Sequence, residues 1–247
     1  MFATDQIIRL GLLPLLIAQG LYVRSQATVL PEPKGPRSGR TGTGPELTLL
    51  ILGDSSAAGV GTDHQSTALC GHLVARLAST HSVHWRLEAT TGHTTQDAVA
   101  RMQALPDLQF DIAVAALGVN DVTRGTSARR FAHCQDRLIA LLRSKFRARL
   151  ILLSGVPPMQ HFPALPQPLA WVLGQQSKRL DQALSHTVQN HGAYVRHLPF
   201  DLPPDPDLAA TDGYHPNATA YGLWAARLHR EITDSAAFPG SRCDHPV

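Results

Sequence analysis

The sequence predicts an α/β protein in which a parallel sheet lies between two layers of helices. Short apolar runs, the first of them at residues 49–52, recur along the chain and are typical of strands buried on both faces. Longer stretches between them carry apolar residues at helical intervals. Because strands that alternate with helices form parallel sheets with right-handed crossovers, we expect a three-layer αβα sandwich with five parallel strands.

The first predicted strand follows the glycines and proline of residues 42–45 and ends at Gly53. The later strands are predicted at residues 83–89, 111–117, 149–154 and 193–198. Helical apolar stripes predict helices at residues 67–79, 95–104, 127–145, 169–190 and 218–232. A proline-rich loop is predicted at residues 156–168.

The ends of the chain are predicted to lie outside the main domain, which we expect at residues 47–232. Residues 1–23 are mostly apolar, but the unbroken apolar stretch from Leu10 to Ala18 is about half of what a spanning helix needs. Two alternatives stay open for residues 7–23: a signal peptide, or an uncleaved helix that contacts a membrane or docks on the domain. Residues 24–46 are rich in proline and glycine and predict a linker, and residues 233–247 predict a mobile tail. Cytoplasmic, membrane-associated and periplasmic locations all stay open, and so does the oligomeric state.

Composition excludes several classes of protein. The chain has 247 residues, 43% of them hydrophobic, which is enough for one sizeable core. Its formal charge of +3 comes from arginines that are spread along the chain, so we expect no nucleic-acid partner. Three irregularly spaced cysteines provide neither a complete disulfide framework nor a zinc spacing. We therefore expect no metal and no cofactor.

Four polar stretches follow predicted strands or precede the last helix: residues 53–55, 90–95, 118–121 and 212–217. Because the carboxyl ends of parallel strands share one edge of a sheet, we expect these stretches to converge there. Ser55 can serve as a nucleophile if His215 removes its proton, and Asp212 can hold the other imidazole nitrogen. The alternative for the Gly-Asp-Ser turn is a plain helix cap.

Acyl transfer also needs donors for the oxyanion that forms in the transition state. The backbone N–H groups of Ser55 and Gly92 and the side-chain amide of Asn120 can supply three. The motif G-x-S-x-G is absent around Ser55, which argues against an ordinary α/β-hydrolase.

These residues resemble the SGNH hydrolases, the GDSL-type esterases and lipases. The four markers of that family match Ser55 in Gly-Asp-Ser, Gly92, Asn120 in Gly-x-Asn-Asp and His215 in Asp-x-x-His, in the same order. The resemblance implies a flavodoxin-like sandwich, metal-independent hydrolysis of esters or thioesters, and Asp212 orienting His215. Two departures, Ser56 after Gly-Asp-Ser and His93-Thr94 after Gly92, predict a more polar site floor.

The expected partner is a small-molecule ester, with short-chain carboxylic esters as the first choice. Lysophospholipids or acyl thioesters come second, and acetylated sugars third. A metallophosphoesterase and a non-catalytic acyl- or sugar-binding module are alternatives from other classes. Candidate substrate-binding residues are Asp54, His93, Phe162, Trp171 and Tyr214.

Overall fold

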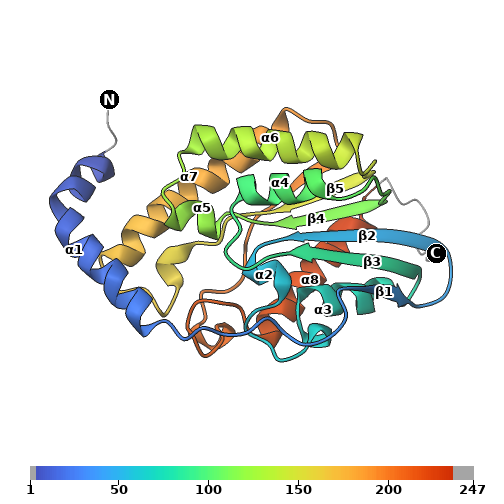
Figure 1. The fold of residues 1–247 in the computed structure, drawn as a ribbon, viewed down its shortest axis with the longest axis horizontal. Helices are drawn as coiled ribbons and strands as arrows, with labels where there is room; N and C mark the ends of the chain where they lie inside the picture. Colours follow the sequence, from blue (N-terminus) through green and yellow to red (C-terminus); the bar gives the residue numbers. More distant parts are fainter. Residues whose placement is uncertain (1–3, 236–247) are drawn as a thin grey trace, which may run out of the picture.

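The computed structural model describes residues 4–235, with side chains from residue 11 on. A central sheet lies between two layers of helices, as Figure 1 shows. Six strands form this sheet in the spatial order β1-β3-β2-β4-β5-β6. Their bounds are Ser38–Thr41 (β1), Glu46–Gly53 (β2), Ser82–Ala89 (β3), Ile112–Ala116 (β4), Leu150–Ser154 (β5) and Val195–Leu198 (β6).

The helices connect successive strands and cover both faces. The α-helices are Thr4–Gln26 (α1), Ser55–Ala58 (α2), Leu69–Leu77 (α3), Thr95–Ala104 (α4), Val119–Thr123 (α5), Ala128–Ser144 (α6), Leu169–Gln189 (α7) and Ala218–Thr233 (α8). Within residues 4–235 the 3₁₀-helices are Gln65–Thr67 (η1), Met159–His161 (η2) and Pro206–Leu208 (η3). The predicted three-layer αβα sandwich is therefore confirmed.

Strand β2 shows why the sheet needs two helical layers. Successive side chains of a strand point to opposite faces, and both faces of β2 are apolar. Leu50 and Leu52 pack into the cluster that contains the buried side chains of α4, α6 and α7. Leu49 and Ile51 pack into the opposite cluster, with residues of α3 and α8. All four leucine and isoleucine side chains are fully buried, as expected for a parallel strand at the centre of such a sheet.

The sheet has six strands rather than five, because an antiparallel strand was missed at one edge. β1 pairs with β3 from Ser38 opposite Arg86 to Thr41 opposite Val83. It lies within residues 24–46, which the proline and glycine content predicted as a linker. All four β1 residues are exposed and carry no apolar pattern, so hydrophobic periodicity could not reveal the strand. Residues 38–41 are thus part of the sheet.

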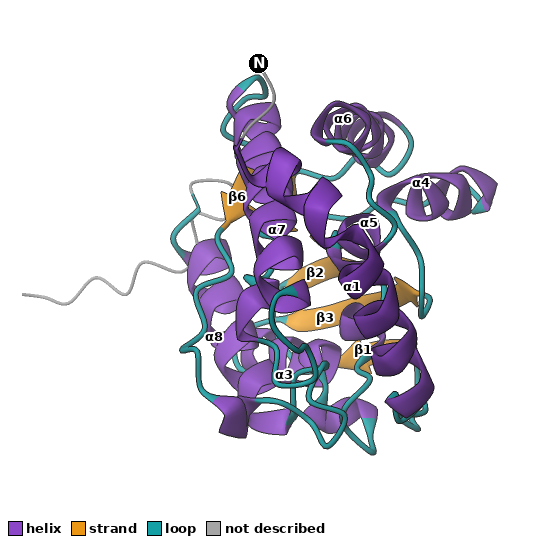
Figure 2. Cartoon of the chain, turned by 90° about the vertical axis from the view of Figure 1, so that its left-hand side faces the viewer, coloured by secondary structure: helices purple, strands orange, loops and turns teal. Residues whose placement is uncertain are grey.

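Helix α1 lies on the outside of the molecule, beside the first turns of α7 (Figures 1 and 2). The Gln19 side chain donates to the Gln167 carbonyl at 2.6 Å and accepts from the Leu169 N–H at 3.1 Å. Val23 packs against the core. None of the described helices combines the length and apolarity that a bilayer-spanning segment requires. Of the predicted tail, residues 236–247 lie outside the described residues.

Candidate active site

The four polar stretches lie at one edge of the sheet. Strands β2, β3 and β4 are adjacent and parallel, so the turns that follow Gly53, Ala89 and Ala116 leave the sheet on the same side. The loop before α8 reaches this edge as well, since His215 contacts Ser55. The sequence therefore predicted the convergence correctly.

Ser55 is the first residue of α2, directly after the carboxyl end of β2. The Asp54 carboxylate caps this helix by accepting from the Ser56 N–H at 3.0 Å. Gly53 is required just before the turn, because a Cβ there would lie 2.1 Å from the Ala116 carbonyl oxygen of β4. The cap interpretation and the nucleophile interpretation are thus compatible: Asp54 caps the helix and Ser55 presents its hydroxyl.

Ser55, His215 and Asp212 form a continuous hydrogen-bonded line. The Ser55 Oγ lies 2.8 Å from His215 Nε2, and Asp212 Oδ2 lies 2.6 Å from His215 Nδ1. Asp212 Oδ1 also accepts from the backbone N–H groups of Tyr214 and His215, each at 3.0 Å. Burial raises the pKa of Asp212, but these hydrogen bonds to His215 and Tyr214 outweigh it and leave the pKa below its usual value. Asp212 is therefore held as a carboxylate against the imidazole.

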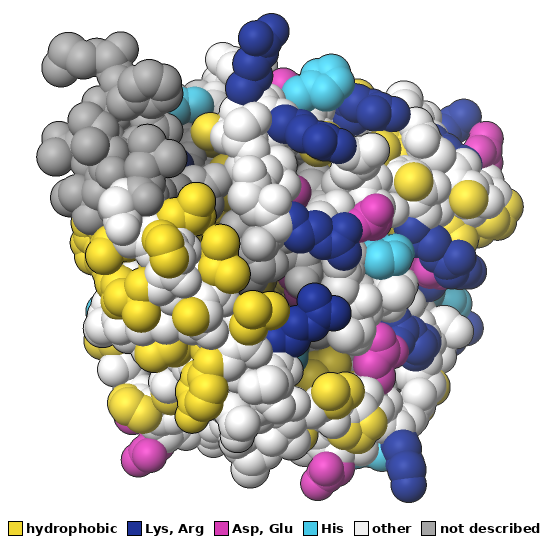
Figure 3. Space-filling model, turned by 60° about the vertical axis from the view of Figure 1, so that its left-hand side comes forward, with side chains coloured by type: hydrophobic (Ala, Val, Ile, Leu, Met, Phe, Trp, Pro, Cys, Tyr) yellow, Lys and Arg dark blue, Asp and Glu magenta, His cyan; other side chains and the backbone are white. Residues whose placement is uncertain are grey.

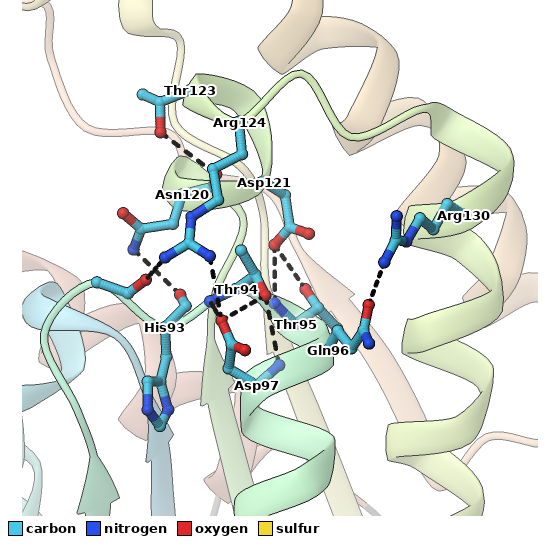
Figure 4. Close-up of polar contacts among 11 residues, drawn as sticks. His93, Thr94, Thr95, Gln96, Asp97, Asn120, Asp121, Thr123, Arg124 and Arg130 are labelled. Carbon is cyan, nitrogen blue, oxygen red and sulfur yellow. Dashed lines mark hydrogen bonds and ion pairs between the residues drawn. The ribbon is translucent and has the colours of Figure 1, made fainter.

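Gly92 and Asn120 follow the neighbouring strands β3 and β4. Gly92 has φ +84°, a left-handed conformation that favours glycine, and open space lies where a Cβ would be. Among the described residues its N–H has no hydrogen-bond partner. Asn120 lies in the first turn of α5, and its Nδ2 donates to the His93 carbonyl at 3.0 Å (Figure 4). An amide nitrogen carries two N–H groups, so a second donor is left on Asn120.

A mainly apolar cavity of about 120 Å³ opens beside Ser55 and His215. Of the candidate substrate-binding residues, Asp54, Phe162 and Tyr214 line it. Phe162 and Tyr214 meet edge to face, with ring centroids 5.1 Å apart. Burial raises the pKa of Asp54 to about 6, while the Ser56 N–H and the His215 charge oppose this shift.

Two candidates are not among the residues that line the cavity: His93 and Trp171. The His93 carbonyl accepts a hydrogen bond from the Asn120 side chain. Trp171 lies in the first turn of α7, where its backbone N–H donates to the Gln167 side chain. Conversely, the sequence prediction missed a wall of the cavity made by residues 200–209, in the first part of the loop between β6 and α8. Its lining residues are Phe200, Leu202, Pro203, Pro204, Asp205, Leu208 and Ala209. Residues 199–209 carry prolines at positions 199, 203, 204 and 206 but no polar motif like that of residues 212–217, and prolines alone do not indicate a binding wall.

The model of the GDSL-like lipase/acylhydrolase family matches residues 51–223. The chain belongs to this family. It is 30% identical over 255 residues to the GDSL-like esterase Rv1075c of Mycobacterium tuberculosis, an alignment that covers 92% of this chain and 78% of that protein. The GDSL-like chain is accordingly a carboxylic ester hydrolase, as its motifs predicted.

Solved structures of esterases share the fold of this GDSL-like chain. The psychrotrophic esterase EstA from Pseudoalteromonas sp. superposes with a TM-score of 0.56 at 22% identity, covering 75% of this chain and 96% of that one. The acetylxylan esterase Axe2 from Geobacillus stearothermophilus superposes with a TM-score of 0.55 at 19% identity, covering 76% and 95%. At these identities the likeness concerns the fold.

Proposed function

We propose that this enzyme hydrolyses esters of short-chain carboxylic acids through an acyl-enzyme formed on Ser55. The observation that carries the proposal is the line from Asp212 through His215 to Ser55, with distances of 2.6 and 2.8 Å, beside an apolar cavity. Such a line activates a hydroxyl that is a weak nucleophile on its own.

In the proposed acylation, Ser55 Oγ attacks the ester carbonyl carbon while His215 Nε2 takes the hydroxyl proton. The tetrahedral intermediate collapses, the C–O bond to the alcohol breaks, and His215 gives its proton to the departing alkoxide. Water, deprotonated by His215, then attacks the acyl carbon. The bond from that carbon to Ser55 Oγ breaks, His215 returns the proton to Ser55, and the acid leaves. Asp212 holds the imidazole in place and stabilises its cationic form, without taking the proton itself.

The oxyanion of each tetrahedral intermediate needs donors that are already in position. We assign this role to the N–H groups of Ser55 and Gly92 and to the free N–H of the Asn120 amide. The bond from Asn120 to the His93 carbonyl fixes the plane of that amide before substrate arrives. No metal or cofactor enters this mechanism.

The cavity supports a short acyl group. A cavity of about 150 Å³ lined by apolar side chains holds one benzene molecule, so a space of about 120 Å³ suits an acyl chain of a few carbons. Acetylated carbohydrate is a second candidate substrate, because acetate is the shortest such acyl group and because similar folds include acetylxylan esterases. Lysophospholipids and long-chain thioesters fit the cavity less well.

A fluorophosphonate probe tests the nucleophile directly. It should label wild-type enzyme at Ser55, and Ser55→Ala should lose both labelling and nearly all ester hydrolysis. A matched control is Ser66→Ala, which removes an exposed hydroxyl away from the cavity and should keep both. Labelling at another serine, or full turnover by Ser55→Ala, would discard the mechanism. Nitrophenyl acetate, butyrate, octanoate and palmitate, together with acetylated xylan, then define the acyl preference.

We also propose that α1 contacts a membrane surface. From residue 11 on, the large apolar side chains of this helix that are roughly half or more exposed are those of Leu13, Leu15, Ile17, Leu21 and Tyr22. Hydrophobic side chains gather over this part of the molecule in Figure 3. Arg9 and Arg24 flank them, and residues 6–31 contain no Asp or Glu, which suits the anionic headgroups of a bilayer surface.

A further inference from the structure

The loop that carries Gly92 is held by side chains at five consecutive positions. Residues 91–95 connect β3 to the body of α4, and each one binds a different side chain. The partners, in order from Thr91 to Thr95, are Glu32, Arg124, Asn120, Asp97 and Asp121. Figure 4 shows four of these partners around the loop. The Thr94–Asp97 pair is the capping box of α4, and the other four contacts tie the loop to Glu32 and to α5.

Arg124 is the partner of Gly92 itself. It lies at the end of α5, where its Nη2 donates to the Gly92 carbonyl at 2.9 Å (Figure 4). Its Nη1 lies 3.6 Å from Asp97 Oδ2, and Asp97 in turn accepts from the N–H and hydroxyl of Thr94. The guanidinium thus joins the end of α5 to the loop and to the first turn of α4. Its planar fork of donors suits two such acceptors better than a single ammonium would.

Glycine provides the loop's left-handed turn but does not hold it. A glycine populates many backbone conformations, so the direction of the Gly92 N–H has to be fixed from outside the residue. Two neighbouring contacts do this. Glu32 binds the N–H and hydroxyl of Thr91 on one side, and Arg124 binds the Gly92 carbonyl on the other. The peptide group that carries the Gly92 N–H, between Thr91 and Gly92, thus lies between two anchored peptide groups.

We propose that Arg124 is a positioning residue for ester hydrolysis, which holds the Gly92 carbonyl so that the Gly92 N–H stays directed at the oxyanion. The proposal rests on the oxyanion role given to Gly92 above. Arg124 touches neither substrate nor the reacting atoms. Its contribution is to remove the freedom of a donor that must be in place before charge develops.

If Arg124 only stabilised the fold, its loss would lower the thermal unfolding midpoint and leave kcat per folded site unchanged. The Arg124 side chain is 60% exposed, and exposed ion pairs contribute little to stability. Arg130 offers a matched control, because its guanidinium also reaches from a helix to α4, where it binds the Gln96 side chain and leaves the Gly92 loop untouched. Loss of either arginine should leave the thermal unfolding midpoint nearly unchanged.

The experiment compares Arg124→Ala with Arg130→Ala in the full chain, using a soluble nitrophenyl ester and active-site titration with a fluorophosphonate. We expect Arg124→Ala to lower kcat about 10- to 100-fold, the range that a displacement of about 1 Å near a reaction centre can cause. KM should stay nearly unchanged. The affinity for a trifluoromethyl ketone, which forms a tetrahedral oxyanion on Ser55, should fall by a similar factor. Guanidinium at millimolar concentration should restore part of the kcat of Arg124→Ala.

A kcat of Arg124→Ala within about threefold of that of Arg130→Ala would overturn the proposal, since this lies far below the effect of a displaced oxyanion donor. So would a loss that appears only in KM, or an unchanged affinity for the trifluoromethyl ketone. Ser55→Ala distinguishes a failure of the positioning role of Arg124 from a failure of the proposed function. If Ser55→Ala is inactive while Arg124→Ala is normal, only the positioning role fails. If Ser55→Ala is active, the proposed function itself fails.

Discussion

In the proposed mechanism Asn120 has two tasks, because its amide nitrogen carries two hydrogens. One N–H donates to the His93 carbonyl, and this bond sets the plane of the amide. The other is available for the oxyanion in the proposed mechanism. A residue that only closed the turn after β4 would need neither the amide nor its orientation.

Replacing Asn120 by alanine should therefore lower kcat by about 10²–10³-fold, the usual cost of one lost oxyanion donor. KM should change little, since the ground-state carbonyl gains less from the donor than the charged intermediate does. Kinetics on enzyme counted by fluorophosphonate titration measure this. Thr123→Ala, which removes a hydroxyl from the same short helix, is the control. A kcat within about threefold of wild type, well inside the expected cost, would remove Asn120 from the site.

Asp54 should make the stability of the folded chain depend on pH in a direction opposite to that of most carboxylates. Its side chain is 2% exposed, and burial raises its pKa from 3.8 to about 6. Between these two values the folded protein holds a proton that the unfolded chain has released. Stability contributed by this group therefore falls as pH rises through that window.

The variant Asp54→Asn isolates this effect, because an asparagine side chain can still cap α2. The unfolding free energy of wild type minus that of Asp54→Asn should decrease by about 2 to 3 kcal/mol between pH 4 and pH 6.5, given about 1.4 kcal/mol per pKa unit. Urea unfolding at a series of pH values measures the difference. A difference that is flat with pH, or that rises, contradicts the raised pKa.

At this scale the sequence predicted the convergence of Ser55, His215 and the two neighbouring loops. Ser55 and the two loops stand directly after strands, and a parallel sheet sends all such turns to one edge, while His215 lies in the loop just before α8. The wall built by Phe200 and Leu202 could not be predicted in the same way. Loop residues with no periodicity acquire their position only from the folded chain, here with Phe200 packed edge to face on Trp224 at 5.2 Å.

Among the helices, α4 and α5 are joined by one buried carboxylate. Asp121 in α5 is 2% exposed and accepts from both the N–H and the hydroxyl of Thr95, each at 2.9 Å. Burial raises the pKa of Asp121, and the two bonds from Thr95 oppose the rise. Gln135 of α6 donates to the same Thr95 hydroxyl. Three helices thus meet at one buried polar group.

Asp121→Ala should destabilise the chain by about 2 to 4 kcal/mol, because it leaves two buried donors of Thr95 without an acceptor. Activity per folded site should fall too, since α5 carries Asn120. Urea denaturation measures the first effect and titrated kinetics the second. Asp107→Ala, which removes a carboxylate that is 88% exposed, should shift stability by less than about 0.5 kcal/mol. Equal stability of the two variants would contradict the joining role.

Whether a helix or strand is visible in the sequence depends on what it buries. Helix α6 was predicted because Phe131, Leu138 and Leu142 recur on one buried face. Strand β1 was not predicted, because none of its residues is buried and it carries no apolar pattern. Helix α5, five residues long, is too short to show a period at all.

For the whole molecule, the exposed face of α1 predicts binding to anionic vesicles. Wild-type protein should sediment with vesicles that contain phosphatidylserine, and less with neutral ones. The double variant Ile17→Ser, Leu21→Ser should reduce binding at least about tenfold, since two apolar side chains leave the interface. Hydrolysis of a soluble ester should stay unchanged. The control Val29→Ser removes an exposed apolar residue outside the helix. Binding that survives the double variant would discard α1 as the contact.

Strand β1 has a consequence for how the chain avoids aggregating. An unpaired strand edge is a template for pairing with other chains. The eight-residue strand β3 would present such an edge if it stood alone on the outer side of β2. β1 covers half of it with four exposed residues that include an arginine, and an edge this short and charged is a poor template. A chain shortened to begin at Glu46 would keep its whole parallel sheet and every proposed catalytic residue, and would leave the edge of β3 open to pairing with a second chain.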